Sequence, residues 1–290
     1  MSPPRRKKKR DEIKVTIGPF RTMTDYQTCM DIQREVWGCQ DIEIVPWFLQ
    51  IAADHYGGLS LAAYNSLGDM IGFASSILGS DKGEPIHYSC LLGVRKAYRN
   101  FDVGFKLKLA QRKEVLRRKI KTIAWTFDPM QPLNAYFNLG KLAARVEGYK
   151  ENLYGETSSP LDKGLPTDRL MASWRLSDKR VEGRLETGPP RRDLRKELKK
   201  YPVVNTLEEI APGMTTCSPV KPNFDAGQVL FEIPYNLPDI KHRNLGVALE
   251  WQGRMRQVFR AYFTKGYAAT DFWLAEDEGH LRTFYYLERR

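Results

Sequence analysis

The sequence predicts a mixed α/β protein, with a central mixed sheet flanked by helices and a small C-terminal unit in the order β-α-β-β. Over the first half of the chain, segments of strand and helix period follow one another as β-α-α-β-β-β-α-β-α. Near residue 100 a strand, a basic loop and a helix come in succession, as in a crossover between adjacent parallel strands. Beyond residue 222 a strand, a long amphipathic helix and two strands predict the smaller unit.

The elements of the first half are predicted from period and punctuation. Residues 13–17 alternate apolar and polar side chains, which indicates a strand, and Asp25 is placed to cap a helix that runs to residue 37. A helix at 46–55 begins with proline in its first turn and ends at a glycine pair. Two hairpin strands follow at 59–64 and 70–78, and the strand before the basic loop lies at 89–94. The helix after the loop lies at 103–119, the next strand at 122–127, and a helix capped by Asn134 at 134–145.

The second half is less regular. Residues 149–165 have no periodic pattern and precede a strand at 170–176, whereas 177–222 are rich in proline, glycine and charge and predict a connector with one basic helix at 191–200. The C-terminal unit is predicted as strands and a helix at 229–234, 248–265, 267–275 and 280–287. We therefore expect a basic tail at 1–12, an α/β domain at 13–178, a connector at 179–222 and an extension at 223–290.

Composition excludes several classes of protein. No apolar run of the 290 residues approaches the roughly 18 that a membrane span needs. The four cysteines form no C-x-x-C pair and the four histidines are scattered, so we expect neither a disulfide framework nor a metal site. A cytoplasmic protein without membrane contact fits this composition. About half of the net charge of +11 comes from six cations at 5–10, which indicates a disordered, solvated basic tail. A targeting signal and contact with nucleic acid are the alternative roles of this tail.

The segment around residues 94–109 carries the clearest functional signal. A short apolar strand ends at Val94, a basic loop containing Arg99 follows, and a helix pattern begins around a lone Gly104. Free backbone amides and the positive end of a helix dipole suit a ligand phosphate. Glycine lets the backbone approach such an anion closely. The sequence therefore predicts a phosphate-binding loop here.

This loop and the order of elements resemble the GNAT superfamily of acyl-CoA-dependent N-acyltransferases. The superfamily's diphosphate motif, Q/R-x-x-G-x-G/A, is matched by the stretch R-N-F-D-V-G at 99–104. Four further blocks resemble a bacterial GNAT subfamily with a C-terminal extension. They are W-T-F-D-P at 125–129, N-A-Y-F-N-L at 134–139, N-L-Y-G at 152–155 and G-L-P-T-D-R-L at 164–170.

The resemblance implies a site for acetyl-CoA or another acyl-CoA as cosubstrate. In the superfamily the loop amides bind the CoA diphosphate, and the preceding strand pairs with the pantetheine arm. The cofactor-binding residues that it implies here are Leu92, Gly93, Val94, Arg99, Asn100, Asp102, Val103, Gly104, Phe105, Lys106 and Asn134. Asn134 has the alternative interpretation of a helix cap alone.

Two residues depart from the family pattern. Asp102 stands where the motif has its first glycine and brings a carboxylate near the expected diphosphate, although it alternatively caps the helix with its side chain. The superfamily often has a tyrosine seven residues after the asparagine, and Lys141 occupies that position.

Acyl transfer to an amine needs a proton acceptor for the amine, polarisation of the thioester carbonyl and a proton donor for the thiolate. His87 and Glu84 precede or lie in the cofactor strand and are the candidate bases. Tyr154 is the candidate acid, and a structural role is the alternative for all three side chains. The pair Asp168 and Arg169 is predicted as a local ion pair, which within the subfamily resemblance shapes the acceptor pocket.

The function predicted from the sequence is transfer of an acetyl or other short acyl group from CoA to an amine, on a small molecule or a peptide, by direct attack. One alternative is a GNAT-like sensor or scaffold that binds CoA or a nucleotide without turnover. The other is a nucleic-acid-binding protein that uses its basic segments. The acceptor and the oligomeric state stay open.

Overall fold

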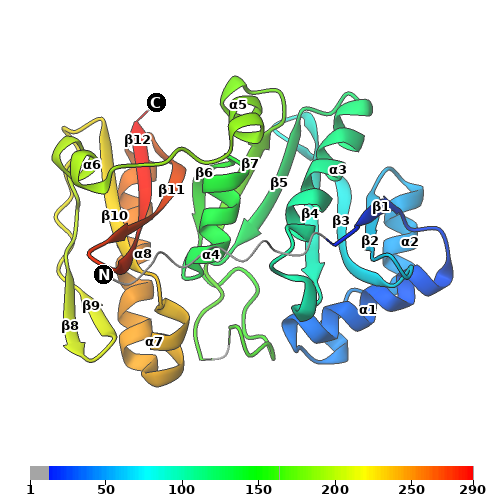
Figure 1. Ribbon diagram of the computed structural model, residues 1–290, viewed down its shortest axis with the longest axis horizontal. Coiled ribbons are helices and arrows are strands. Elements are labelled where there is room, and N and C mark those ends of the chain that lie inside the picture. The colour runs from blue at the N-terminus through cyan, green and yellow to red at the C-terminus, as the bar shows by residue number, and fades with distance from the viewer. Residues whose placement is uncertain (1–12, 163, 290) are drawn as a thin grey trace, which may run out of the picture. The chain divides into compact units, whose positions relative to one another are not determined.

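The computed structural model describes residues 13–162 and 164–289, and the chain divides into two compact units, Met1–Ile120 and Lys121–Arg290 (Figure 1). The predicted basic tail, residues 1–12, lies outside the described residues. Each unit combines a sheet with flanking helices, so the predicted mixed α/β class is confirmed. The predicted division at residues 178 and 222 stays a prediction.

The first unit contains a meander of antiparallel strands in the order β1-β2-β3-β4. The strands are Thr16–Pro19, Leu59–Tyr64, Met70–Asp81 and Glu84–Val94. The helices are α1 (Met23–Trp37), α2 (Trp47–His55) and α3 (Val103–Arg117), with short 3-10 turns η1 (Asp41–Glu43) and η2 (Lys96–Tyr98). Predicted and observed bounds agree for β2, whereas β1 begins and ends later than predicted.

A capping box starts α1. The Thr22 hydroxyl accepts from Asp25 N at 3.3 Å, and the Asp25 carboxylate accepts from Thr22 N at 2.9 Å. Asp25 is therefore the third residue of the first turn, and the prediction that it is the cap itself was wrong. The helix ends at Gly38, whose φ of 62° is left-handed.

Helices pack on both faces of the first sheet. Cys29 and Ile32 of α1 pack against Ala62 and Phe73 of the sheet, and all four side chains are fully buried. Helix α3 contacts β2, β3 and β4, and Val103, its first residue, lies close to Gly72 of β3. The loop between β4 and α3 thus lies at the end of a strand whose sheet is covered on both sides.

The second unit has a sheet in the order β5-β7-β6-β11-β12-β10 and a separate hairpin β8-β9. These strands are β5 (Thr122–Phe127), β6 (Arg145–Lys150), β7 (Arg169–Arg175), β8 (Leu207–Ala211), β9 (Met214–Cys217), β10 (Gln228–Pro234), β11 (Tyr267–Asp277) and β12 (His280–Arg289). The helices are α4 (Pro132–Ala135), a π-helix η3 (Tyr136–Lys141), α5 (Lys179–Thr187), α6 (Leu194–Lys200), α7 (Leu237–Arg243) and α8 (Leu245–Thr264).

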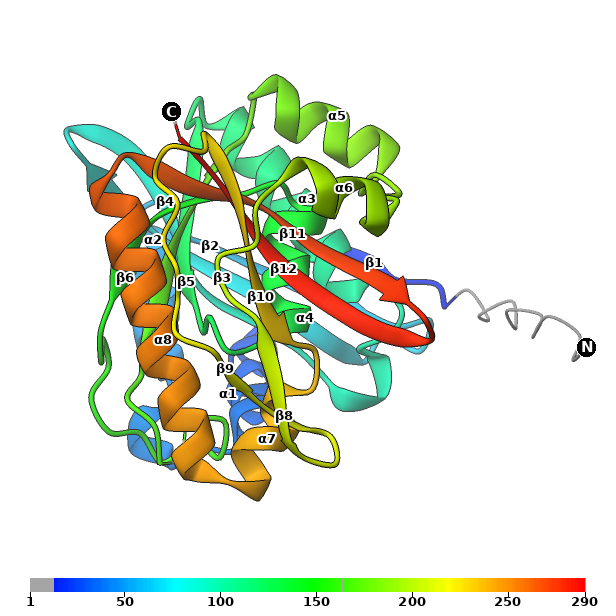
Figure 2. The same ribbon diagram turned by 90° about the vertical axis from the view of Figure 1, so that its left-hand side faces the viewer.

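The predicted β-α-β-β order of the C-terminal unit is confirmed by β10, the helix pair α7 and α8, β11 and β12 (Figure 2). On one face of this sheet, Leu194 of α6 packs against Trp273 and Phe284. On the other face, Phe259 of α8 meets Tyr285 edge-on, with their ring centroids 5.0 Å apart. These aromatic residues therefore form part of the core.

Three predictions in the second unit were wrong in detail. The helix predicted at 134–145 is a single turn, α4, followed by the π-helix, and a strand that the pattern did not indicate, β6, begins at Arg145. Asn134 lies inside α4, whose cap position is Gln131, so it does not cap the helix. The predicted connector contains two helices and a hairpin rather than one helix.

Buried ion pairs explain why the connector is ordered. Arg184 of α5 and Arg192, which precedes α6, both pair with Asp271 of β11, at 3.2 and 2.6 Å. The guanidinium of Arg192 also lies 4.4 Å from the centroid of the Trp273 ring. Charged side chains of the predicted connector therefore hold this segment on the sheet.

Within residues 13–162 and 164–289, no helix combines the length and the apolar character that crossing a membrane requires.

Candidate functional site

The loop between β4 and α3 is fastened to the rest of the first unit by Arg95. Its Nε donates to Met70 O at 3.0 Å, and its guanidinium forms an ion pair with Glu35 of α1. The backbone amide of Lys96 donates to the same carboxylate at 3.1 Å. Arg99, on the exposed part of the loop, donates from Nε to Val94 O at 3.3 Å. The loop thus presents an exposed cation from an anchored turn.

Asp102 precedes α3 in a left-handed backbone conformation. Its φ of 55° and ψ of 20° are left-handed, a region that aspartate tolerates better than most residues. The side chain makes no capping hydrogen bond to α3, so the alternative of a side-chain cap was wrong. Asp102 therefore combines a left-handed turn into α3 with a carboxylate at the same position.

The start of α3 has the features of an anion site. Its first intrahelical bond runs from Lys106 N to Asp102 O at 3.0 Å. The amides of Val103, Gly104 and Phe105 precede that bond and so have no acceptor within the helix. The helix is 15 residues long, and its dipole adds positive potential at this end. Arg99 and Lys106 flank these three residues in the sequence and carry cationic side chains.

Strand β4 leads into this loop and contains a bulge. Leu92, Gly93 and Val94 pair regularly with Ala74, Phe73 and Gly72 of β3. Further back the register changes, because Leu91 faces Ser75 while Tyr88 faces Ile77. Two residues of β4, Ser89 and Cys90, therefore lie opposite the single residue Ser76. Bulges of this kind are common beside active sites because they withdraw backbone from the ladder.

A buried polar cluster, consisting of Ser89, Lys108 and Gln111, lies between this bulge and α3. Lys108 Nζ donates to Gln111 Oε1 at 2.7 Å and to Ser89 Oγ at 3.2 Å. The Lys108 side chain is 2% exposed, and burial lowers its pKa to about 7. The sequence analysis missed this lysine; the available signal was its position within the apolar face that Leu107 and Val115 define.

The candidate bases lie at different places on β4. His87 is fully buried, its Nδ1 lies 2.9 Å from Ser76 Oγ, and its Nε2 has no hydrogen-bond partner among the described residues. Burial, assisted by the Arg118 cation, lowers the pKa of His87 to about 4. Glu84 is exposed at the first position of the strand, at the opposite end from Val94. The structure thus separates Glu84 from the phosphate loop by the length of β4.

A hollow of about 500 Å³ opens in the first unit beside the loop, lined in part by Arg95 and Tyr98. Its polar groups are bonded to one another: Tyr64 Oη donates to Asp25 at 2.7 Å, and Asn65 Nδ2 donates to Tyr98 Oη at 3.3 Å. These bonds stabilise the turn between β2 and β3 against the loop.

In the second unit, the aromatic and amide candidates are each fixed by a neighbour. Tyr154 is 52% exposed, and its Oη lies 2.9 Å from Thr126 Oγ1 of β5. Asn134 is exposed, and its Oδ1 accepts from Asn138, which in turn accepts from Trp125 Nε1 at 3.1 Å. Hydrogen bonds that run from Trp125 of β5 through Asn138 of the π-helix therefore position the side-chain oxygen of Asn134.

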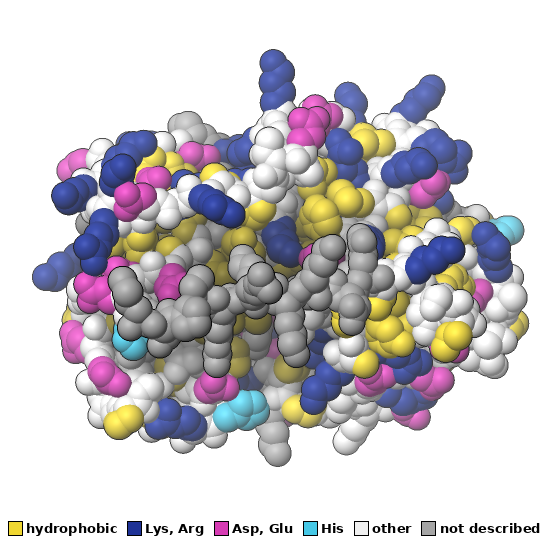
Figure 3. Space-filling model, viewed as in Figure 1, with side chains coloured by type: hydrophobic (Ala, Val, Ile, Leu, Met, Phe, Trp, Pro, Cys, Tyr) yellow, Lys and Arg dark blue, Asp and Glu magenta, His cyan; other side chains and the backbone are white. Residues whose placement is uncertain are grey.

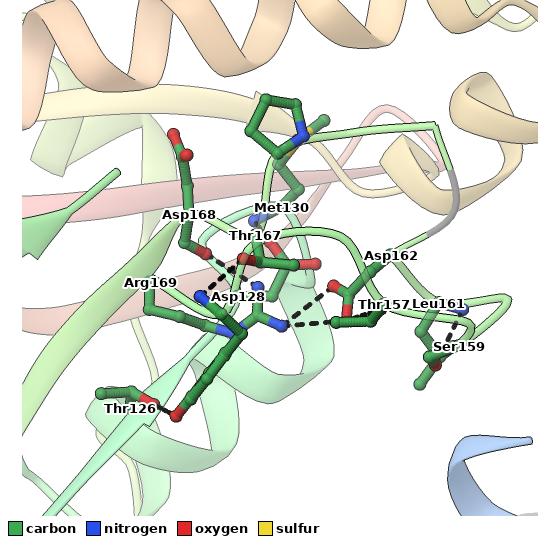
Figure 4. Close-up of polar contacts among 12 residues, drawn as sticks. Thr126, Asp128, Met130, Thr157, Ser159, Leu161, Asp162, Thr167, Asp168 and Arg169 are labelled. Carbon is green, nitrogen blue, oxygen red and sulfur yellow. Dashed lines mark hydrogen bonds and ion pairs between the residues drawn. The ribbon is translucent and has the colours of Figure 1, made fainter. Parts of the chain in front are cut away.

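Three of the subfamily-like blocks meet around the segment between β6 and β7 (Figure 4). Asn152 Oδ1 accepts from Thr167 N at 3.1 Å, and Tyr154 N donates to Thr167 Oγ1 at 2.9 Å. The guanidinium of Arg169 lies 5.4 Å from the centroid of the Tyr154 ring. Residues that the sequence left as separate motifs thus form one bonded cluster in the second unit.

Asp168 and Arg169 do not pair with each other through their side chains, so the predicted local ion pair was wrong. Asp168 is buried and forms two hydrogen bonds with Arg256 of α8, at 2.6 and 2.8 Å, while Tyr149 Oη donates to it at 2.5 Å. Arg169 instead forms two hydrogen bonds with Asp162, at 2.9 and 3.0 Å. Two ion pairs therefore hold the β6–β7 segment.

Asp128 follows β5 directly and is a further carboxylate of this cluster. It accepts from Met130 N at 2.8 Å, and burial raises its pKa above the ordinary value. The sequence analysis treated it only as part of a proline-containing turn. A carboxylate at the end of a buried strand was the signal that pointed to it.

Among the described parts of the chain, no group of three or more His, Cys, Asp or Glu side chains is arranged to hold a metal ion. On the face that Figure 3 shows, Lys and Arg side chains are dispersed among acidic ones.

No protein-family model matches this sequence, and no curated protein matches it. Among solved structures, the chain is similar to an acetyltransferase of the GNAT family from Desulfovibrio desulfuricans, with 12% identity over 57% of this chain and 100% of that one, at a TM-score of 0.47. It is also similar to Arabidopsis thaliana Naa50 in complex with the bisubstrate analogue CoA-Ac-MVNAL, with 16% identity over 55% and 97% of the two chains, at a TM-score of 0.44.

A third similar structure is the GCN5-related glucosamine N-acetyltransferase region of a fungal multidomain GH3 β-N-acetylglucosaminidase. The match has 14% identity and a TM-score of 0.33, and it spans 39% of this chain and only 13% of that one. The descriptions of two of these proteins name the GNAT family or an N-acetyltransferase. At these identities and TM-scores the similarity assigns neither an activity nor a substrate to this chain.

Proposed function

We propose that this protein is an N-acyltransferase that moves a short acyl group, acetyl foremost, from CoA to an amine. The single observation that carries the proposal is the β4–α3 loop. There, Asp102 in the left-handed conformation turns the chain into α3, the first amides of the helix are unpaired within it, and Arg99 is exposed beside them. This combination suits a diphosphate.

The geometry of β4 supports the same ligand. If the diphosphate lies at the start of α3, the pantetheine arm would run back along Leu92–Val94. A strand rises about 3.3 Å per residue, so the Ser89–Cys90 bulge lies roughly 13–17 Å from the end of the strand. An extended pantetheine arm covers a length of this order. We propose that the thioester lies at the bulge and that a backbone amide withdrawn from the ladder there polarises its carbonyl.

The reaction that we propose is direct attack. The amine nitrogen forms a bond to the thioester carbonyl carbon, the carbon–sulfur bond breaks, the amine loses one proton and the thiolate gains one. Tyr154 is the proposed donor to the thiolate, and His87 and Glu84 are the proposed proton acceptors. The acceptor is an amine on a small molecule or a peptide.

Calorimetry with CoA and acetyl-CoA tests whether the protein binds the proposed cosubstrate. We expect saturable binding of both ligands at micromolar concentration. Arg99→Ala should weaken binding by about 1–3 kcal/mol, roughly 5- to 150-fold in Kd, because a charge-assisted hydrogen bond to phosphate is lost. The matched control is Arg117→Ala, which removes an exposed cation from the other end of α3. Absence of binding, or equal losses in both variants, would contradict the site.

Kinetic measurements distinguish the proposed proton donor from the proposed proton acceptors. Tyr154→Phe should lower kcat by about 10²–10⁴-fold, the range for general acid catalysis, with an unchanged Kd for CoA. If His87 is the base, the acidic limb of kcat/KM should fall near pH 4, because that is where the pKa of His87 lies. Glu84→Gln tests the alternative base. Full activity in both Tyr154→Phe and Glu84→Gln, together with an acidic limb that does not fall near pH 4, would remove these assignments.

A second candidate function is a CoA-binding sensor or scaffold without turnover. The observations that favour it are Lys141 at the position where the superfamily often has tyrosine and the complete burial of His87. CoA binding without thiol release over a broad panel of amines would support the sensor. Thiol release with any amine would exclude it.

A further inference from the structure

The side-chain amide of Asn138 is buried and bonded at both ends. Asn138 lies in the π-helix η3 and is 3% exposed. Its Oδ1 accepts from the indole Nε1 of Trp125 at 3.1 Å, and its Nδ2 donates to Asn134 Oδ1 at 3.1 Å. A buried amide in this situation keeps one orientation, because turning it over would set donor against donor and acceptor against acceptor.

The indole of Trp125 sets the direction of these two hydrogen bonds. An indole N–H only donates, so the end of the Asn138 amide that faces it must be the oxygen. The nitrogen of Asn138 then faces Asn134, whose oxygen is the side-chain atom able to accept from it. Trp125, Asn138 and Asn134 therefore form a directed amide relay. Its last member is exposed, and the end turned away from Asn138 is the NH2 group, which suits a ligand atom that accepts a hydrogen bond.

The amide relay is supported by well-packed parts of the second unit. Trp125 of β5 is 7% exposed, and its ring meets that of Trp174 edge-on, with the centroids 6.1 Å apart. The π-helix is held near its end by Arg184 of α5, which donates to Gly140 O and pairs with Asp271 at 3.2 Å. A side chain that binds a ligand gains affinity from such support, because less freedom is lost on binding. Short π-helical segments often lie at functional sites.

We propose that Asn138 is a positioning residue that, held by Trp125, presents the NH2 group of Asn134 to an acceptor oxygen of acyl-CoA. The inference rests on the proposed function and deepens it, because it states which end of Asn134 meets the cosubstrate and what fixes that end. Acyl-CoA offers acceptor oxygens of two kinds, the amide carbonyls of the pantetheine arm and the phosphates. Either kind accepts from an amide NH2 group.

The relay itself is tested without any ligand, through the indole N–H resonance of Trp125 in proton–nitrogen correlation spectra. Trp125→Phe assigns this resonance among those of the six tryptophans. Asn138→Leu should shift it, because a side chain of similar size replaces the acceptor; Asn138→Ser serves if the leucine variant does not fold. Asn205→Leu is the matched control, because it removes another buried amide bonded at both ends, to the backbone of Glu232, and should leave the resonance in place. A resonance that Asn138→Leu leaves unchanged overturns the proposal.

A double-mutant cycle on the affinity for CoA, measured by calorimetry, tests the positioning. Asn134→Ala and Asn138→Leu should each weaken binding roughly 2- to 12-fold, the range for one neutral hydrogen bond. The double variant should bind no more weakly than Asn134→Ala alone, because Asn138 acts through Asn134. Asn205→Leu should bind as the wild type does. Fully additive losses, or equal affinity of the wild type and Asn138→Leu, overturn the proposal.

Asn134→Asp tests which end of the amide meets the ligand. It keeps the oxygen that faces Asn138 and replaces the NH2 group with a second oxygen, so it should bind CoA no better than Asn134→Ala. Binding of CoA by Asn134→Asp as tight as by the wild type overturns the proposal.

The nucleotide part of CoA, which keeps the diphosphate but lacks the pantetheine arm, locates the acceptor oxygen. If Asn134→Ala weakens binding of this nucleotide and of CoA alike, the acceptor is a phosphate oxygen. If it weakens binding of CoA alone, the acceptor is a pantetheine carbonyl. CoA binding that is the same in the wild type and Asn138→Leu overturns only the positioning, whereas a wild type that binds no CoA overturns the proposed function.

Discussion

At the scale of a single residue, Asp102 holds a left-handed backbone conformation at the start of α3. A left-handed residue at the start of a helix usually is glycine, and for L-residues with a Cβ this conformation costs roughly 1–2 kcal/mol. Aspartate is among the residues that tolerate it best, and it holds φ at 55° here. The sequence motif indicated only that a charged residue stands at position 102 where a glycine was expected. The backbone angle explains why the position accepts both.

Substitutions of Asp102 separate the effect of its backbone conformation from the effect of its negative charge. Asp102→Gly should tighten CoA binding several-fold, because it removes a carboxylate near the proposed diphosphate while the backbone path is kept. Asp102→Ala should lower the free energy of unfolding by about 1 kcal/mol relative to Asp102→Gly, because alanine tolerates a positive φ poorly. Calorimetry and urea denaturation measure the two effects. Tighter binding by the alanine variant with unchanged stability would contradict the assignment of strain.

His87 makes stability depend on pH in the acidic range. Its pKa is lowered from 6.5 to about 4 in the folded chain by burial and by Arg118, so between these values the unfolded chain binds more protons. Stability should therefore rise with pH across this window. His87→Gln should flatten the wild-type curve by about 2 kcal/mol between pH 4 and 7, as followed by thermal unfolding. Curves that stay parallel would show that His87 titrates as an ordinary histidine.

At the scale of elements, long charged side chains hold in place segments for which the sequence predicts no regular structure. The β6–β7 segment lacks any periodic pattern, yet Asp168 at its end is fully enclosed and paired with Arg256 of α8. Period analysis detects strands and helices through their apolar faces. It does not detect a loop that is ordered by ion pairs between residues 88 positions apart.

Removing one partner of this pair should be costly. Arg256→Met leaves the buried Asp168 carboxylate without its cation and should lower the free energy of unfolding by about 3 kcal/mol. Arg254→Met is the matched control, because its ion pair with Glu250 is longer, at 3.8 Å, and more exposed. Urea denaturation measures both variants. Equal effects of the two substitutions would show that burial of Asp168 does not decide the stability.

At the scale of the whole molecule, the C-terminal extension shares a sheet with earlier strands of the second unit. Ala269 of β11 pairs with Val146 of β6, and Tyr285 of β12 donates to Pro129 O at 2.8 Å. The sequence identified the β-α-β-β order of this extension correctly. It did not indicate β6, so the strand to which the extension attaches was absent from the prediction.

Truncation after Lys221 should therefore abolish folding of the second unit. It removes β10, β11, β12 and α8, together with the cation that pairs with Asp168. We expect the shortened chain to be recovered only in the insoluble fraction, with no CoA binding after refolding. A soluble, cooperatively unfolding product of residues 1–221 would contradict this expectation and would support the predicted division at residue 222.

The sequence alone determined the class of fold and the order of most elements, because apolar period and glycine or proline punctuation act over a few residues. The phosphate-binding loop that it predicts at 99–104 stays a prediction. Tertiary structure decided the rest: the bulge opposite Ser76, the buried amine of Lys108 and the partners of Asp168 and Arg169. Each depends on which residues far apart in the chain share a space without water. The cost of burying a charge is set by that space and not by neighbouring residues in the sequence.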